Sequence, residues 1–212
     1  MVYNLEYVSS GEGGRMNEFK KIFSKKYARG GWDGKGSGSG SSLSANKKYI
    51  PFLEKYLFDY GIKRVIDYGC GDWQFSQHVK WRDIDYLGLD AVESVIEKNQ
   101  IKFPAHKFVC DTDVFPYLKG RDIIIVKDVL MHWPDKEIES FLDRLTKHDI
   151  WILLVNAATR QPTPRKLRIG GFVHLEYDKF PLNKYNPELL FEFSNRQVVR
   201  LDRWQGIPTS SR

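Results

Sequence analysis

One short segment constrains the fold of this chain more than any other: residues 65–73, VIDYGCGDW. An apolar run ends in a carboxylate, and a Gly-x-Gly turn follows. Glycines at such a turn permit positive φ and let a ligand approach the backbone closely. In doubly wound α/β sheets, ligands bind outside the carboxyl ends of the strands. The segment therefore predicts an α/β fold with a ligand site at this turn.

Strand and helix patterns alternate through the middle of the chain. The predicted strands are nearly continuous apolar runs, at residues 63–69, 85–90, 106–111, 121–128 and 149–156. Helical patterns separate some of them, at residues 91–100 and 135–145. Strands that are apolar throughout and separated by helices indicate a parallel sheet covered on both faces.

The N-terminal part is less regular. Residues 16–29 predict an amphipathic helix, and a second helix is expected to begin at an N-cap Ser44 and to restart at Pro51. The Gly/Ser-rich stretch between them, residues 30–44, is either a flexible linker or a loop that closes over a ligand. Trp32 favours the loop, because a pure linker has little use for an indole.

The C-terminal part predicts an insertion followed by a hairpin. Residues 157–186 contain three prolines and two glycines, and long insertions in compact domains tend to be lids or binding loops. We expect this one to recognise the substrate. Two strand patterns then follow, joined by a tight turn at Asn195-Arg196, which predicts an antiparallel hairpin at the edge of the sheet.

Charge and cysteine content narrow the class of protein. The 33 basic and 27 acidic residues give a net charge of +6; no basic block is interleaved with aromatic residues, so solubility explains the surplus better than nucleic acid does. Cys70 and Cys110 fit neither a disulfide scaffold nor a zinc spacing. No apolar run approaches the roughly 20 residues that span a bilayer, and a signal-peptide pattern is missing. We expect a soluble, cytoplasmic protein.

Two classes of cofactor compete for the Gly-x-Gly turn. Dinucleotide binders need G-x-G-x-x-G so that a pyrophosphate rests on a helix N-terminus, but Gln74 stands at the third glycine position, after Trp73. Asp67 would repel a phosphate, whereas it suits the amino group of a methionine moiety. The spacing D-x-G-x-G therefore favours S-adenosylmethionine (SAM) over NAD.

Two further acids follow the next predicted strands. Asp90 lies about 20 residues beyond the glycines, where a carboxylate can accept both hydroxyls of an adenosine ribose. Asp111-Thr112 ends the third strand, where a carboxylate can accept from an adenine amino group. Each acid taken singly also fits a turn or helix-cap position. Three acids at three successive strand ends favour a nucleoside-containing cofactor.

Three segments resemble the class I SAM-dependent methyltransferases: VIDYGCGDWQFS, YLGLDAVESVIEKNQ and VKDVLMHWP. The resemblance covers roughly residues 36–156 and is strongest to a subgroup that often accompanies glycosyltransferases, including multidomain proteins that build capsid glycans in large algal viruses. It implies a Rossmann-like, seven-stranded, mostly parallel sheet with an antiparallel last strand. It also implies SAM as donor, S-adenosylhomocysteine (SAH) as product, and a location in the host cytoplasm if the source is viral.

The resemblance also implies residue roles. The first turn would hold the methionine end of the cofactor, the second strand end the ribose and the third the adenine. The implied cofactor-binding residues are Asp67, Gly69, Cys70, Gly71, Trp73, Asp90, Ala91, Asp111 and Thr112. Trp73 departs from the family pattern, which has a third glycine there, so the next helix must start differently and the indole is expected to shape the pocket.

Candidate catalytic residues follow the fourth strand. Asp128 and His132 are the general bases we favour, because that strand end faces the sulfonium. Alternatively, Asp128 positions the cofactor or the substrate without taking a proton, and His132 is a structural residue that links a loop to the core. His174 is the second-choice base, and Trp133 and Phe172 are expected to stack on a sugar ring. The acids Asp111, Asp113 and Asp128 leave a divalent metal for a sugar diol open, but nothing fixes its geometry, so a metal is not predicted.

We interpret the chain as one domain in four parts: an N-terminal helix with a cofactor-closing arm (1–44), a cofactor-binding core (45–156), a substrate-loop insertion (157–186) and a C-terminal hairpin (187–212). The predicted activity is methyl transfer to a sugar hydroxyl, such as that of rhamnose in a glycan or nucleotide-sugar. The alternatives are a methyltransferase for RNA or a small metabolite, and a binding module without activity.

Overall fold

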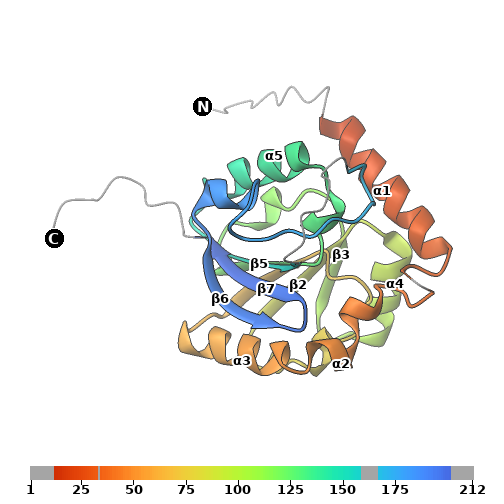
Figure 1. The fold of residues 1–212 in the computed structure, drawn as a ribbon. Coiled ribbons are helices and arrows are strands. Elements are labelled where there is room, and N and C mark those ends of the chain that lie inside the picture. Colours follow the sequence, from red (N-terminus) through yellow and green to blue (C-terminus); the bar gives the residue numbers. More distant parts are fainter. Residues whose placement is uncertain (1–11, 33, 159–166, 202–212) are drawn as a thin grey trace, which may run out of the picture.

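A seven-stranded sheet forms the centre of the computed structural model, which describes residues 12–32, 34–158 and 167–201 (Figure 1). The strands are β1 (Arg64–Tyr68), β2 (Asp85–Asp90), β3 (Lys107–Cys110), β4 (Ile123–Lys127), β5 (Trp151–Ala157), β6 (Glu188–Phe193) and β7 (Arg196–Leu201). The α-helices are α1 (Glu12–Ala28), α2 (Leu43–Asn46), α3 (Tyr49–Asp59), α4 (Glu93–Lys102) and α5 (Asp135–Leu145).

The order of strands in the sheet is β3-β2-β1-β4-β5-β7-β6. The strands β1 to β5 pair in parallel, whereas β7 is antiparallel to both of its neighbours, β5 and β6. The predicted mostly parallel sheet with an antiparallel last strand is therefore confirmed. Because β1 to β4 are parallel, their carboxyl ends meet at one edge of the sheet, which is where α/β proteins bind ligands.

The strands are apolar throughout because both faces of the sheet are covered. All five residues of β4 are buried: Ile124 and Val126 pack toward the side of α5, and Ile123 and Ile125 toward the side of α3. Figure 1 shows α5 and α3 on opposite sides of the sheet. The apolar residues of α5 recur at helical spacing, at Ile138, Phe141, Leu142 and Leu145, and all are buried.

The helices before β1 differ in detail from the prediction. The predicted second helix is divided into α2 and α3, and Pro51 lies in the first turn of α3, where proline is tolerated. The N-cap of α2 is Ser42 and not Ser44, because the Ser42 hydroxyl accepts the backbone N–H three residues on. Ser44 instead lies inside α2.

The C-terminal hairpin also differs by one residue. Its turn is formed by Ser194 and Asn195, with Ser194 at a φ of 52°, and Arg196 is already the first residue of β7. The rest of the predicted hairpin segment, residues 202–212, lies outside the described part of the chain. No helix among the described residues is long and apolar enough to cross a membrane.

Residues 167–186 make up most of the described part of the insertion after β5. It contains one short 3₁₀ helix, Leu182–Tyr185, and buries Val173 and Leu175 against the α5 side of the sheet. Backbone hydrogen bonds join Val173 to Met131 and Leu175 to Ala157. This part of the insertion is therefore packed onto the sheet, next to the residues that follow β4.

Candidate functional site

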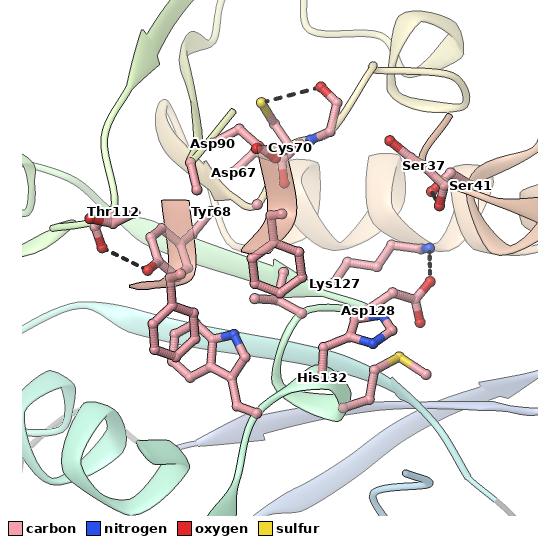
Figure 2. Close-up of a pocket in the computed structure, with 18 of the residues that line it drawn as sticks. Ser37, Ser41, Asp67, Tyr68, Cys70, Asp90, Thr112, Lys127, Asp128 and His132 are labelled. Carbon is pink, nitrogen blue, oxygen red and sulfur yellow. Dashed lines mark hydrogen bonds and ion pairs between the residues drawn. The ribbon is translucent and has the colours of Figure 1, made fainter. Parts of the chain in front are cut away.

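A cavity of about 440 Å³ opens at the carboxyl ends of β1 to β4 (Figure 2). Its wall comes mainly from the four strand ends, from α1 and from the Gly/Ser-rich arm before α2, here residues 30–32 and 34–42. In Figure 2, Asp67 and Asp90 lie on one side of the cavity and Lys127, Asp128 and His132 on another. The volume is that of a pocket for one small-molecule ligand.

The turn after β1 requires its two glycines. Gly69 has a φ of 76° and Gly71 a φ of 54°, a region that favours glycine. A Cβ on Gly69 would lie 2.3 Å from Cγ2 of Val129, and one on Gly71 would lie 2.2 Å from Oγ of Ser37. Side chains at either position would therefore fill space that the turn shares with the arm and with the segment after β4.

Two acids stand beside this turn, of which Asp67 is buried and Asp90 is partly buried. The carboxylate of Asp67 accepts a hydrogen bond from the Tyr86 hydroxyl at 2.7 Å, and the carboxylate of Asp90 accepts from the backbone N–H groups of Gly71 and Val92, each at 3.0 Å. Desolvation raises the pKa of both carboxyls to about 6. Both acids are ionised at neutral pH, and a cation bound nearby would stabilise them.

The third acid follows β3. The Asp111 carboxylate accepts from the Tyr117 hydroxyl at 2.9 Å and from the backbone N–H of Asp113 at 2.9 Å. The Thr112 carbonyl accepts from the Tyr68 hydroxyl at 2.8 Å, as the dashed line in Figure 2 shows. These bonds fix the Asp111-Thr112 segment at the cavity wall. The three acids that the sequence placed at successive strand ends thus face one cavity.

Asp128 is held by two cations. Its carboxylate lies 2.6 Å from the Lys127 Nζ and accepts two hydrogen bonds from the Arg196 Nε, at 2.9 and 3.0 Å. Lys127 is buried and also donates to the Gly40 carbonyl at 3.3 Å. Because both carboxylate oxygens of Asp128 are engaged by these two cations, the geometry favours the alternative in which Asp128 has a positioning role over the one in which it takes a proton.

His132 follows β4 and lines the same cavity. Its Nδ1 lies 2.5 Å from the Gly171 carbonyl oxygen, and its backbone carbonyl accepts from Gly170. Because a carbonyl only accepts, Nδ1 carries the proton and Nε2 retains a lone pair. Burial lowers the pKa of His132, so the ring is neutral at pH 7. His132 therefore has both features considered for it, a link to the insertion and a free basic nitrogen.

The arm is hydrogen bonded to the Gly-x-Gly turn. The Ser37 hydroxyl accepts from the Asp72 backbone N–H at 2.9 Å and lies 2.6 Å from the Tyr27 hydroxyl. The Ser37 backbone N–H in turn donates to the Asp72 carboxylate at 3.2 Å. Of the two interpretations of the Gly/Ser-rich stretch, this packing fits a loop at the ligand site better than a linker.

Most of the residues expected at the site line the cavity: Asp67, Gly69, Cys70, Gly71, Asp90, Ala91, Asp111, Thr112, Asp128, His132, Trp133 and Phe172. Two of the expected residues do not. The Trp73 indole is buried in the core and donates to the Tyr86 hydroxyl at 2.7 Å, so it supports Asp67 through Tyr86 and does not shape the pocket itself. His174 lies outside the lining and contacts the Phe172 ring.

The sequence alone did not single out several residues of the wall. Tyr27 and Phe23 come from α1, Tyr68 from β1, Lys127 from β4 and Arg196 from β7. The position of Tyr68 directly after Asp67, at the end of the same strand, was a usable signal. The contribution of Arg196 had none, because it depends on the antiparallel pairing of β7 with β5.

Two indole N–H groups in the cavity wall have no acceptor among the described residues, those of Trp32 and Trp133. Buried donors of this kind are normally paired, so a ligand or water that offers acceptors would complete them. The described residues contain no group of three or more His, Cys, Asp or Glu side chains placed to hold a metal ion.

Comparison with known proteins gives a consistent result at low identity. No protein-family profile matches the chain. Phosphoethanolamine N-methyltransferase 1 of Arabidopsis thaliana is 28% identical over 107 residues, which are 47% of this chain and 22% of that protein. The matched region is thus less than a quarter of the length of that relative.

Solved structures show the same fold. Magnesium protoporphyrin IX methyltransferase from Synechocystis PCC 6803, crystallised with SAM, superposes with a TM-score of 0.57 at 17% identity, over 87% of this chain and 95% of that one. Mitomycin 7-O-methyltransferase gives 0.53 at 16% identity, over 78% and 61%. The chain therefore has the α/β Rossmann-like fold found in SAM-dependent methyltransferases, and the relative and the two solved structures named here are methyltransferases.

Proposed function

We propose that this chain is a SAM-dependent methyltransferase that transfers a methyl group to a hydroxyl of a sugar. One observation carries the donor assignment: Asp67, Asp90 and Asp111, at the ends of β1, β2 and β3, face a single cavity beside the Gly-x-Gly turn. Magnesium protoporphyrin IX methyltransferase, which has the same fold, has been crystallised with SAM and with SAH.

The residues of the cavity fit SAM. When bound, SAM supplies a methyl group on a positively charged sulfonium, together with an amino acid end, a ribose and an adenine. Asp67 would bind the amino group, Asp90 the ribose hydroxyls and Asp111 the adenine amino group. The unpaired N–H groups of Trp32 and Trp133 would donate to acceptor atoms of the bound molecules. A set of acids suits a cation better than it suits the pyrophosphate of a dinucleotide.

His132 supports a hydroxyl acceptor. A hydroxyl loses its proton as it attacks, and a positioned base contributes about 10²–10⁴-fold to such a step. The Nε2 atom of His132 has the lone pair for this task, because Nδ1 is bonded to the Gly171 carbonyl. Holding the acceptor in line with the methyl group supplies much of the remaining acceleration.

The sugar, and a role beside glycosyltransferases, rest on the sequence resemblance and on the residues near the base. Phe172 is 50% exposed, and its ring centroid lies 6.0 Å from that of His132. An exposed aromatic face next to the base suits a sugar ring. Trp133 is buried to 7% exposure, so it shapes the cavity wall and presents little surface for stacking.

Isothermal titration calorimetry tests the donor, with SAM, SAH and NAD as titrants. We expect micromolar binding of SAM and SAH and none of NAD; a preference for NAD would overturn the donor assignment. Methyl transfer from isotopically labelled SAM then tests the acceptor, with a rhamnose oligosaccharide, an RNA and phosphoethanolamine compared. Transfer to the RNA or to phosphoethanolamine in place of the sugar would overturn the acceptor assignment and leave the donor assignment standing.

A further inference from the structure

A second hollow adjoins the cavity. It has a volume of about 570 Å³ and lies between the arm and the turn that joins β6 to β7. Four residues line both spaces: Ser39, Gly40, Phe172 and Arg196. Each space is of the size that accommodates a small-molecule ligand. An enzyme that transfers a group from a donor to an acceptor must bind the two molecules side by side, and adjoining spaces allow this.

The two spaces differ in chemistry. The cavity has the acids that suit a cationic donor. Among the described residues that line the hollow, there is neither an acid nor a lysine. Its polar lining consists of serine hydroxyls, the Asn195 amide and the Arg196 guanidinium. Hydroxyl and amide groups both donate and accept hydrogen bonds, which is the pattern that a molecule with many hydroxyls presents in return.

Arg196 stands where the two spaces meet. Its Nε donates to Asp128, and its Nη1 donates to the Asn195 side chain at 3.0 Å. No described residue accepts a hydrogen bond from Nη2, which would lie 2.2 Å from a Cβ on Gly40. Gly40 therefore leaves the room in which this end of the guanidinium lies. The Asp128 carboxylate fixes the orientation of the Arg196 guanidinium. The guanidinium N–H groups that are not bonded to Asp128 or Asn195 can then donate to a bound molecule.

We propose that the hollow between the arm and the β6–β7 turn binds a second sugar unit of the acceptor, with Arg196 and Phe172 at the junction guiding the reacting unit toward His132. The proposal rests on the function proposed above and deepens it by naming the acceptor site. It assigns Asp128 as a positioning residue that acts through Arg196.

A neutral, hydroxyl-rich occupant fits better than an anion. Oxyanions offer acceptors only, so they would leave the acceptor capacity of the serine hydroxyls unused. Asp128 also already neutralises Arg196 in part, through both of its carboxylate oxygens. An acceptor of two or more sugar units would use both the hydroxyls of the hollow and the exposed face of Phe172.

The test blocks the hollow without touching the cavity. Ser44 is exposed, and it lines the hollow but not the cavity. The indole of Ser44→Trp would therefore fill the hollow and leave the cavity unchanged. Lys47 is exposed just beyond α2 and lines neither space, which makes Lys47→Trp the matched control. Calorimetry with SAH measures the donor site. Titration of SAH-saturated protein with a rhamnose disaccharide, and KM values for that disaccharide and for methyl α-L-rhamnoside, measure the acceptor site.

We expect Ser44→Trp to weaken disaccharide binding and to raise its KM by about tenfold or more, with a smaller rise for the monosaccharide and an unchanged Kd for SAH. Lys47→Trp should match the wild type throughout. Equal disaccharide KM values in wild type and Ser44→Trp would overturn the proposal that the hollow binds a second sugar unit, and would leave the proposed function standing. Binding of SAH without binding of either sugar would overturn the hollow and the sugar acceptor together. Failure to bind SAH would overturn the proposed function itself, and the hollow with it.

Discussion

The Nδ1 atom of His132 lies 2.5 Å from the carbonyl oxygen of Gly171, so the insertion after β5 is bonded directly to the proposed base. The bond fixes the tautomer and leaves the lone pair on Nε2. The backbone N–H of Gly170 donates to the His132 carbonyl at 2.9 Å, which ties the same two segments a second time. The position of the base therefore depends on the insertion.

Replacing the base while keeping this link gives the first prediction. In His132→Asn, the amide nitrogen can still donate to Gly171, but no basic nitrogen remains. We expect kcat to fall by about 100-fold or more, with the Kd for SAM within about twofold of wild type. His174→Asn, in the same insertion but outside the cavity lining, should retain kcat. Steady-state kinetics measure kcat of the two variants, and calorimetry measures their Kd for SAM. An equal loss of kcat in both variants would show that His132 is not the base.

The pH dependence of the wild type gives a second prediction for the same residue. Burial lowers the pKa of His132 below its usual 6.5, so the ring is already neutral at pH 7. We expect kcat to stay nearly level between pH 7 and 9 and to fall at more acidic pH, as the ring gains a proton. A kcat that keeps rising between pH 7 and 9 would show that another group is the base.

Donor binding should depend on pH through Asp67. Desolvation raises the pKa of Asp67 to about 6, and a cationic ligand favours the ionised carboxylate. The affinity for SAM should therefore be level above pH 7 and fall below pH 6, with protonation of Asp67 alone contributing up to about tenfold per pH unit.

Calorimetry between pH 5 and 8 measures this effect, with two variants as controls. Asp67→Asn should bind SAM more weakly and lose part of the pH dependence, the rest coming from Asp90, whose pKa is also about 6. Asp83→Asn, at an exposed position, should behave as wild type. An affinity that is unchanged at pH 5 would contradict an ionised acid at the donor site.

The turn glycine Gly71 offers a matched pair with Gly61. Their φ angles are 54° and 62°, and alanine at either position costs about 1–2 kcal/mol of backbone strain. A Cβ on Gly61 meets nothing within 4 Å, whereas one on Gly71 would overlap the Ser37 hydroxyl. Gly71→Ala should therefore lose SAM binding, while Gly61→Ala only lowers the melting temperature. Calorimetry and thermal denaturation separate the two effects, and full SAM affinity in Gly71→Ala would contradict the close packing of arm and turn.

The fold was predictable where local pattern decides it. The apolar runs of β4 and β5 and the helical spacing of α5 indicate their structures directly, and the order of acids at strand ends indicates the cavity. The direction of the Trp73 side chain was not predictable, because its position in the motif does not reveal which way the side chain points. In the structure the indole turns into the core, where it bonds Tyr86.

Contacts between segments that are distant in the sequence were not predictable, because they depend on how the strands pair. Asp128 and Arg196 are 68 residues apart, and they meet because β7 pairs antiparallel to β5 in one particular register. A shift of that register by one residue would turn Arg196 to the other face of the sheet. The sequence therefore indicated Asp128 as a general base, whereas in the structure its carboxylate is bonded to Lys127 and Arg196.

Removing the charge of Asp128 gives the last prediction. Asparagine tolerates the φ of 56° at this position, so Asp128→Asn leaves the backbone in place and deprives two largely buried cations, Lys127 and Arg196, of their shared partner. Breaking a buried ion pair costs about 3–5 kcal/mol, which for a chain of this size lowers the melting temperature by roughly 6–20 °C.

The exposed pair of Lys55 and Asp59 provides the control, because Asp59→Asn should cost less than about 1 kcal/mol. Under conditions where Asp128→Asn is folded, its kcat should keep the same acidic fall as the wild type, since the base is His132. Thermal denaturation and a pH profile of the two variants check both statements. A stable Asp128→Asn whose pH profile has lost the acidic fall would show that Asp128 itself takes the proton.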